Sequence, residues 1–119
     1  MSDKIWLVAQ YPLKSPKGSK RDHWLREKAS EYLELALSDA ELGCVDGWDM
    51  GRSLAASDVY VLNIFCVVTQ EEQAIACVKR VLRESRLDYT RVKIATMPDG
   101  GESYTLRYAA RKGVTDFSL

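Results

Sequence analysis

Two carboxylates three positions apart, Asp46 and Asp49, are the first residues whose types and spacing suggest chemistry. They belong to the segment Asp-Gly-Trp-Asp-Met-Gly, in which Trp48 lies between them and glycines flank them. Paired carboxylates can bind a divalent cation, but a calcium loop needs more oxygen ligands at closer spacing. In an extended strand, residues 46 and 49 would also point to opposite faces. The segment therefore favours a solvated edge strand or an acidic surface that meets a partner, rather than a metal site.

The single histidine, His23, and the three cysteines do not form a catalytic or metal-binding set. As a general base, His23 would need a nucleophile, and only Ser19, Cys66 and Cys77 are arguable partners. The cysteines, Cys44 included, contain no Cys-x-x-Cys pair, so one histidine and scattered thiols give no zinc site. We therefore predict a protein that is not an enzyme and that has no metal and no cofactor.

Two groups of residues raise the question of anion or nucleic-acid binding. The first precedes an expected helix and comprises Lys14, Lys17, Lys20 and Arg21. The second lies on the last expected strand and comprises Tyr104, Arg107, Tyr108 and Arg111. A helix N-terminus favours anions, but the spacing of a P-loop is missing from the first group. The aromatic signature of an RNA-binding sheet is missing from the second. We expect a solvated loop and tyrosines that cover the sheet or pack on a second copy, and no nucleic-acid binding.

Composition and charge also indicate a globular domain that does not bind nucleic acid. Hydrophobic residues make up 46% and charged residues 29%, which is typical of one globular domain. Seventeen basic residues balance 17 acidic ones, whereas nucleic-acid binders usually have a basic excess. The charge is nevertheless segregated, because residues 31–72 carry nine acidic side chains and one basic one, Arg52. The segments 1–30 and 73–119 each carry a basic excess of four.

The expected elements follow from hydrophobic periodicity and from turn signals. They are a strand at 4–11, a helix at 22–41, strands at 44–50 and 58–68, a helix at 69–86, and strands at 91–97 and 103–109. This order predicts an α+β fold of the ferredoxin-like type: a βαββαβ antiparallel sheet with two helices on one face and an extra C-terminal strand. We expect a single domain over residues 1–113 and a frayed tail over 114–119.

Capping residues and apolar spacing predict where each helix begins and which face of the first helix is buried. Asp22 is the expected N-cap of the first helix, and its apolar stripe is expected at Leu25, Ala29, Tyr32, Ala36 and Ala40, widened by Leu33 and Leu37. Thr69, with Glu72 three residues later, is the expected cap of the second helix.

The most apolar segment, residues 58–68, contains one amide, Asn63. An unsatisfied buried amide would cost about 1–3 kcal/mol. Asn63 is therefore expected either to tie neighbouring loops together, which we favour, or to line a pocket.

The apolar run at residues 5–9 is too short for a signal peptide. The run at 59–68 is too short to span a membrane. All three cysteines are expected to be buried thiols in a reducing compartment. We expect a soluble cytoplasmic protein without a membrane partner.

One segment carries a resemblance. The pattern Asp-Gly-x-Asp-x-Gly at residues 46–51, followed by Asn-Ile-Phe at 63–65, resembles small uncharacterised bacterial proteins, several of which are similar to toxin-immunity proteins. The likeness extends over residues 43–85. In that pattern a small or acidic stretch precedes Asn-Ile-Phe, whereas residues 52–62 here are longer and apolar. Toxin-immunity proteins neutralise a secreted toxin by binding it, but the resemblance brings no family activity and no catalytic residues.

These observations favour a non-catalytic protein-binding module, an immunity-type inhibitor of a basic bacterial toxin or nuclease. Its expected partner-binding residues are Glu41, Asp46, Trp48, Asp49 and Asp58, because carboxylates complement a basic partner and a tryptophan anchors an interface. The alternative is a small-molecule sensor or accessory subunit with a pocket between sheet and helices, lined by Asn63 and Tyr60. A homodimer that pairs through the last strand is a third option.

Overall fold

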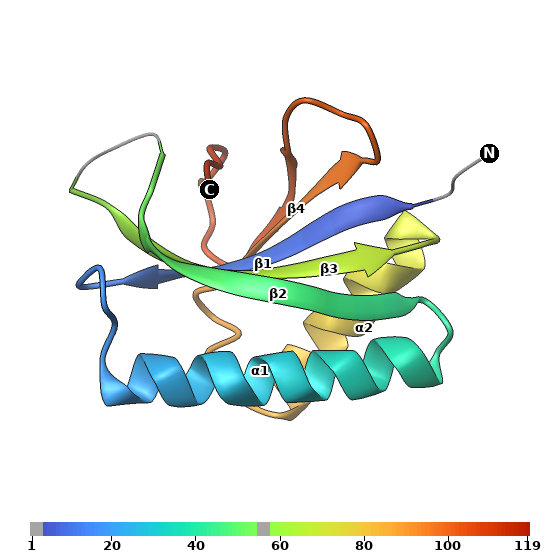
Figure 1. The fold of residues 1–119 in the computed structure, drawn as a ribbon, viewed down its shortest axis with the longest axis horizontal. Helices are drawn as coiled ribbons and strands as arrows, with labels where there is room; N and C mark the ends of the chain where they lie inside the picture. Colours follow the sequence, from blue (N-terminus) through green and yellow to red (C-terminus); the bar gives the residue numbers. More distant parts are fainter. Residues whose placement is uncertain (1–3, 55–57) are drawn as a thin grey trace.

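The computed structural model describes residues 4–54 and 58–119 of the chain. Its elements are β1 (Ile5–Leu13), α1 (Lys20–Asp39), β2 (Gly43–Arg52), β3 (Tyr60–Val68), α2 (Glu71–Glu84), β4 (Lys93–Pro98) and β5 (Thr105–Ala109). The strands form one sheet in the order β2-β3-β1-β4-β5, and all neighbours are antiparallel (Figure 1). The expected α+β class, with two helices and a five-stranded antiparallel sheet, is confirmed.

The core lies between the sheet and the helices. Side chains alternate along each strand, so every second residue of β1 and β3 faces α1 and α2. These core residues include Leu7, Ala9 and Tyr11 of β1 and Leu62, Ile64 and Cys66 of β3. Both helices lie on one side of the sheet, and the C-terminal segment lies on the other (Figure 1). We call this second side the helix-free face.

The N-cap of helix α1 lies three residues before the expected one. Ser19 is the N-cap, and Asp22 completes a capping box: Ser19 Oγ accepts from the Asp22 N–H, and the Asp22 carboxylate accepts from the Ser19 N–H. The buried stripe is Leu25, Ala29, Leu33 and Leu37. The expected stripe is confirmed at these four residues and at Ala36, which is partly buried against the core. It was wrong for Tyr32, which is 36% exposed, and for the exposed Ala40.

Helix α2 has no side-chain cap. Its N-cap is Gln70, which adopts a left-handed conformation with φ 52°. The expected cap, Thr69, instead donates its backbone N–H to the Leu42 carbonyl oxygen at 2.8 Å. Thr69 therefore ties the end of β3 to the connection between α1 and β2, and the expectation of a capping role was wrong.

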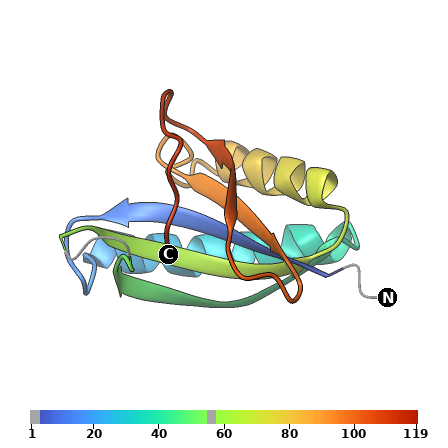
Figure 2. The same ribbon diagram turned by 90° about the horizontal axis from the view of Figure 1, so that it is seen from above.

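The C-terminal segment, residues 114–119, has no regular secondary structure. It runs across β1 toward β3 on the helix-free face (Figure 2). Three buried apolar side chains, Val8, Val61 and Ala95, lie on strands of this face and are outside the main core. The frayed tail expected from the sequence is thus placed against the sheet. No helix in the described part of the chain is long and apolar enough to cross a membrane.

Candidate functional site

A row of four polar residues crosses the helix-free face, one on each of four neighbouring strands. In order from β2 to β4, the row is Asp49, Asn63, Gln10 and Lys93, and each is the register partner of the next. The Gln10 amide donates to Asn63 Oδ1 at 2.9 Å, and the Asn63 amide donates to Asp49 Oδ1 at 2.8 Å. Because Gln10 and Asn63 are 4% and 2% exposed, these bonds satisfy amides that water does not reach. Asn63 thus links strands rather than loops.

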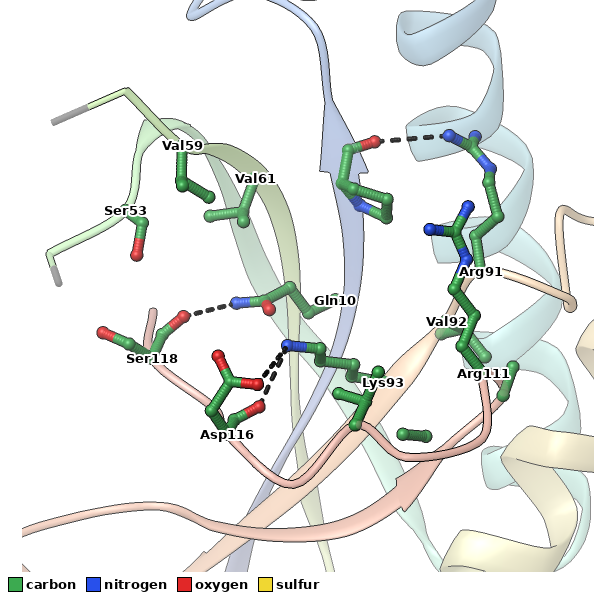
Figure 3. A pocket seen from close by; sticks show the side chains of 14 residues that line it. Gln10, Ser53, Val59, Val61, Arg91, Val92, Lys93, Arg111, Asp116 and Ser118 are labelled. Atoms are coloured by element: carbon green, nitrogen blue, oxygen red, sulfur yellow. Dashed lines mark hydrogen bonds and ion pairs between the residues drawn. The ribbon is translucent and has the colours of Figure 1, made fainter. Parts of the chain in front are cut away.

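The C-terminal segment is bonded to this row and to the loop that follows β2. Gln10 Nε2 also donates to the Ser118 carbonyl oxygen at 2.8 Å, and Lys93 Nζ donates to the Asp116 carbonyl oxygen at 2.9 Å (Figure 3). The Phe117 ring lies 6.0 Å from the Tyr104 ring, centroid to centroid. The Leu54 N–H donates to the Leu119 carbonyl oxygen at 2.6 Å. These contacts place the segment as a wall above the sheet.

A cavity of about 320 Å³ lies between this wall, the sheet, and the segments that precede β3 and β4. Its apolar lining is aliphatic: Pro12, Val59, Val61, Val92, Ala109, Ala110 and Val114. Its polar lining is Gln10, Ser53, Arg91, Lys93, Arg111, Asp116 and Ser118 (Figure 3). The volume lies at the lower end of the range of about 300–1,000 Å³ that small-molecule sites occupy.

The lining contains three cations and one carboxylate. Arg91 is already paired, because its guanidinium binds the Asp88 carboxylate at 2.5 Å and the Pro12 carbonyl oxygen at 3.4 Å. Lys93 Nζ lies 4.0 Å from Asp116 Oδ1, in a side chain that is 92% exposed. Arg111 has no ion pair or hydrogen bond within residues 4–54 and 58–119. The cavity therefore has a positive excess and one uncommitted guanidinium.

Asp88 holds two elements next to the cavity. Its carboxylate binds Arg91 and also Arg21 of α1, the latter at 2.9 Å. Partial burial alone would raise the pKa of Asp88, but the hydrogen bonds and charges of Arg91 and Arg21 outweigh burial and lower it. The paired carboxylate thereby keeps Arg91 fixed at the rim of the cavity.

The five partner-binding residues expected from the sequence do not form one cluster. Asp46 is the exposed extra residue of a β-bulge, and Asp49 is bound to Asn63. Glu41 precedes β2 and Asp58 follows it, so a ten-residue strand, about 30 Å long, separates them. Trp48 is 45% exposed, and the Arg26 guanidinium lies 4.5 Å from its ring centroid. A cation of α1 therefore lies against the expected anchor.

The remaining candidates have local partners. His23 Nε2 lies 2.8 Å from the Lys17 carbonyl oxygen. The expectation that all three cysteines are buried was wrong for Cys44, which is exposed on edge strand β2. Burial raises the pKa of the Cys66 thiol to about 12 and raises that of Cys77. Burial therefore disfavours the thiolate form of both residues.

The tyrosines and basic residues of the last strand also have partners within the chain. Lys79 lies 4.2 Å from the Tyr108 ring centroid. Arg107 Nε binds the Glu71 carboxylate at 2.8 Å. Tyr104 packs on Phe117, and burial raises the pKa of its hydroxyl.

Comparison with protein-family models, curated proteins and solved structures gives no match. Sequence reasoning missed Gln10, Lys93 and Asp116, because their proximity depends on strand register and on the path of the C-terminal segment. One signal was available: Gln10 is a polar residue on an otherwise apolar strand.

Proposed function

We propose that this chain is a non-catalytic binding protein whose site is the cavity on the helix-free face. The observation that carries the proposal is the combination, in one cavity, of an aliphatic lining with the uncommitted Arg111. A small concave site with a mainly apolar lining and a few polar groups is the usual form of a small-molecule site. The buried thiols and the locally bonded His23 give no nucleophile and base in contact, which supports binding rather than catalysis.

This proposal keeps the small-molecule alternative of the sequence analysis but puts the pocket on the other face of the sheet. The pocket was expected between the sheet and the helices, but that space is filled by close-packed side chains such as Tyr11, Leu33 and Ile64, all fully buried. The cavity lies on the opposite face because the C-terminal segment supplies its second wall.

A thermal-shift screen of small metabolites tests the proposal. A compound that binds only the folded state raises the Tm, by about 10 °C near 100 times its Kd. We expect such compounds, and we expect Ala109→Leu, which fills the cavity, to abolish the shift. The matched control is Ala76→Leu, on the exposed side of α2, which should keep it. An unchanged shift in Ala109→Leu, or no stabilising compound at all, contradicts the proposal.

A second candidate is the protein-binding module predicted from the sequence. It is favoured by Trp48, a large aromatic that is 45% exposed on an edge strand and lies in the acidic part of the chain. The resemblance to immunity-type proteins supports a basic toxin as the partner. Affinity purification from the native host, washed at low and high salt, should retain one basic protein stoichiometrically. Retention unchanged in the double variant Asp46→Asn, Asp49→Asn would exclude this surface.

We further propose that the fold is a ferredoxin-like arrangement extended by β5. The support is the sheet order β2-β3-β1-β4, together with α1 and α2 as the two crossovers on one face. A reducing, cytoplasmic setting is likewise a proposal, and the three free cysteines support it.

A further inference from the structure

We propose that the ligand of this cavity is a small organic carboxylate with an apolar body, and that Arg111 binds its carboxylate. This inference rests on the proposed function, since it names the class of ligand for the same site. It follows from three features of the cavity: its charge, its lining, and the contact that the C-terminal segment already makes there.

The charge of the cavity selects an anion. Four cationic side chains line it or adjoin it through Asp88: Arg21, Arg91, Lys93 and Arg111. Among the described residues of the lining and of the Asp88 ion pairs, the opposing carboxylates are Asp88 and Asp116. A positive excess beside apolar walls attracts anions, because the walls concentrate the field in the cleft. A neutral ligand would leave this excess uncompensated.

Arg111 is the group that remains to bind an anion. Arg91 is held by Asp88 and by the Pro12 carbonyl, and Lys93 is held by the C-terminal segment. The Arg111 side chain is drawn within the same lining, with Arg91 nearby in the view (Figure 3). A guanidinium presents paired N–H donors that match the two oxygens of a carboxylate.

The lining indicates that the part of the ligand other than its carboxylate is apolar. Four valines, two alanines and a proline surround the space, and no aromatic side chain is among the described lining residues. Burial of an aliphatic or simple cyclic body against these side chains lowers the free energy, because it removes apolar surface from water. A nucleobase, in contrast, would lack an aromatic ring on which to stack. The small volume restricts the body to a short chain or a single ring.

The Asp116 carboxylate lies beside Lys93 and would affect the binding of an anion in the cavity. The Asp116 carboxylate approaches Lys93 only to 4.0 Å, and it is 92% exposed, so the pair is weak. A bound anion would be repelled by this carboxylate and attracted by Lys93. Asp116→Asn should therefore tighten carboxylate binding roughly two- to fivefold.

The test uses the full chain and four probe pairs: hexanoate, 4-methylpentanoate, cyclohexanecarboxylate and phenylacetate, each with its primary amide. Affinities are measured by titration in nitrogen-15 correlation NMR. We expect at least one acid to bind about tenfold or more tightly than its amide. Arg111→Gln should remove about tenfold or more of that affinity. Lys112→Gln, which removes an exposed neighbouring cation outside the lining, should change it less than about twofold.

The outcomes separate this inference from the proposed function. If amides bind as tightly as acids and Ala109→Leu still blocks them, the cavity is a ligand site and the carboxylate assignment is wrong. The carboxylate assignment is also wrong if the acids bind to Arg111→Gln as tightly as to the unchanged protein. It is likewise wrong if hexyl phosphate binds far more tightly than hexanoate. If all eight probes fail and the metabolite screen finds nothing, both proposals fail.

Discussion

Asn63 uses both ends of its side chain to join three strands: its oxygen accepts from Gln10, and its nitrogen donates to Asp49. Asn63→Ala removes both bonds and leaves the Gln10 donor without this acceptor in a buried site. We expect a loss of about 1–3 kcal/mol of unfolding free energy, measured by urea denaturation. Gln73→Ala, an exposed amide on α2, is the control and should change stability by less than about 0.5 kcal/mol. Equal effects of the two changes would mean that the row of bonds contributes nothing.

The three thiols are expected to differ in reactivity. Cys44 is exposed, whereas Cys66 is fully buried and Cys77 is 4% exposed. Because burial raises the pKa of Cys66 to about 12, its thiolate is scarce at pH 8 as well as shielded. An aromatic disulfide reagent should label one thiol in the folded protein and all three in denaturant. Cys44→Ser should abolish the fast labelling, and fast labelling that persists in this variant would contradict the placement of Cys66 and Cys77.

At the scale of elements, the connection between α1 and β2 depends on one glycine. Gly43 has φ 153°, and a Cβ there would lie 2.1 Å from the Val67 carbonyl oxygen. Gly47, at the bulge of the same strand, has open space around the corresponding position. We expect Gly43→Ala to cost roughly 2–4 kcal/mol and Gly47→Ala less than about 1 kcal/mol. Comparable urea midpoints for the two variants would refute this account of the connection.

The clamp of Asp88 on Arg21 and Arg91 should depend on pH. Its folded-state pKa is below the ordinary value of 3.8, so its stabilisation is present above that value and is lost as pH falls through the folded-state pKa. Asp88→Asn keeps the left-handed backbone, since asparagine tolerates φ 50°. It should cost about 1–2 kcal/mol at pH 7, and this cost should shrink as pH falls through the folded-state pKa of Asp88. Asp99→Asn is the exposed control, and a cost of Asp88→Asn that is independent of pH would argue against the clamp.

The elements themselves were largely predictable, because hydrophobic periodicity is a local signal. Strand β3 was expected at 58–68 and lies at Tyr60–Val68, and α2 was expected at 69–86 and lies at Glu71–Glu84. Caps were less predictable: competing backbone acceptors, such as the Leu42 carbonyl for Thr69, come from distant residues. The candidate site was not predictable, since Gln10, Asn63 and Lys93 meet only through strand register.

At the scale of the whole molecule, the charge blocks of the sequence are separated by the sheet. The acidic block, residues 31–72, contains β2, and the basic block, 73–119, contains β5. Since β2 and β5 are the two edges of the sheet, the blocks lie toward opposite edges. The cavity draws most of its cations from the basic block, which favours an anionic ligand. The β2 edge would instead attract a basic partner, so the two proposed functions use different parts of the surface.

Deletion of the C-terminal segment, residues 114–119, distinguishes the frayed tail predicted from the sequence from the segment that the structure places against the sheet. A frayed tail could be deleted without effect, whereas the segment placed here bonds to Gln10, Lys93 and Leu54 and packs Phe117 on Tyr104. Ordering six residues offsets much of this gain. We therefore expect deletion of residues 114–119 to cost only about 1–3 kcal/mol.

Deletion of the segment should also remove one wall of the cavity, and with it the binding of any compound found in the thermal-shift screen. Phe117→Ala is the matched point variant, because it removes the ring contact and leaves the backbone bonds in place; it should lose stability without losing the cavity. If the deleted protein keeps both its urea midpoint and its ligand shifts, the segment frays in solution. The helix-free face would then be open, and the cavity would lose the wall that the segment supplies.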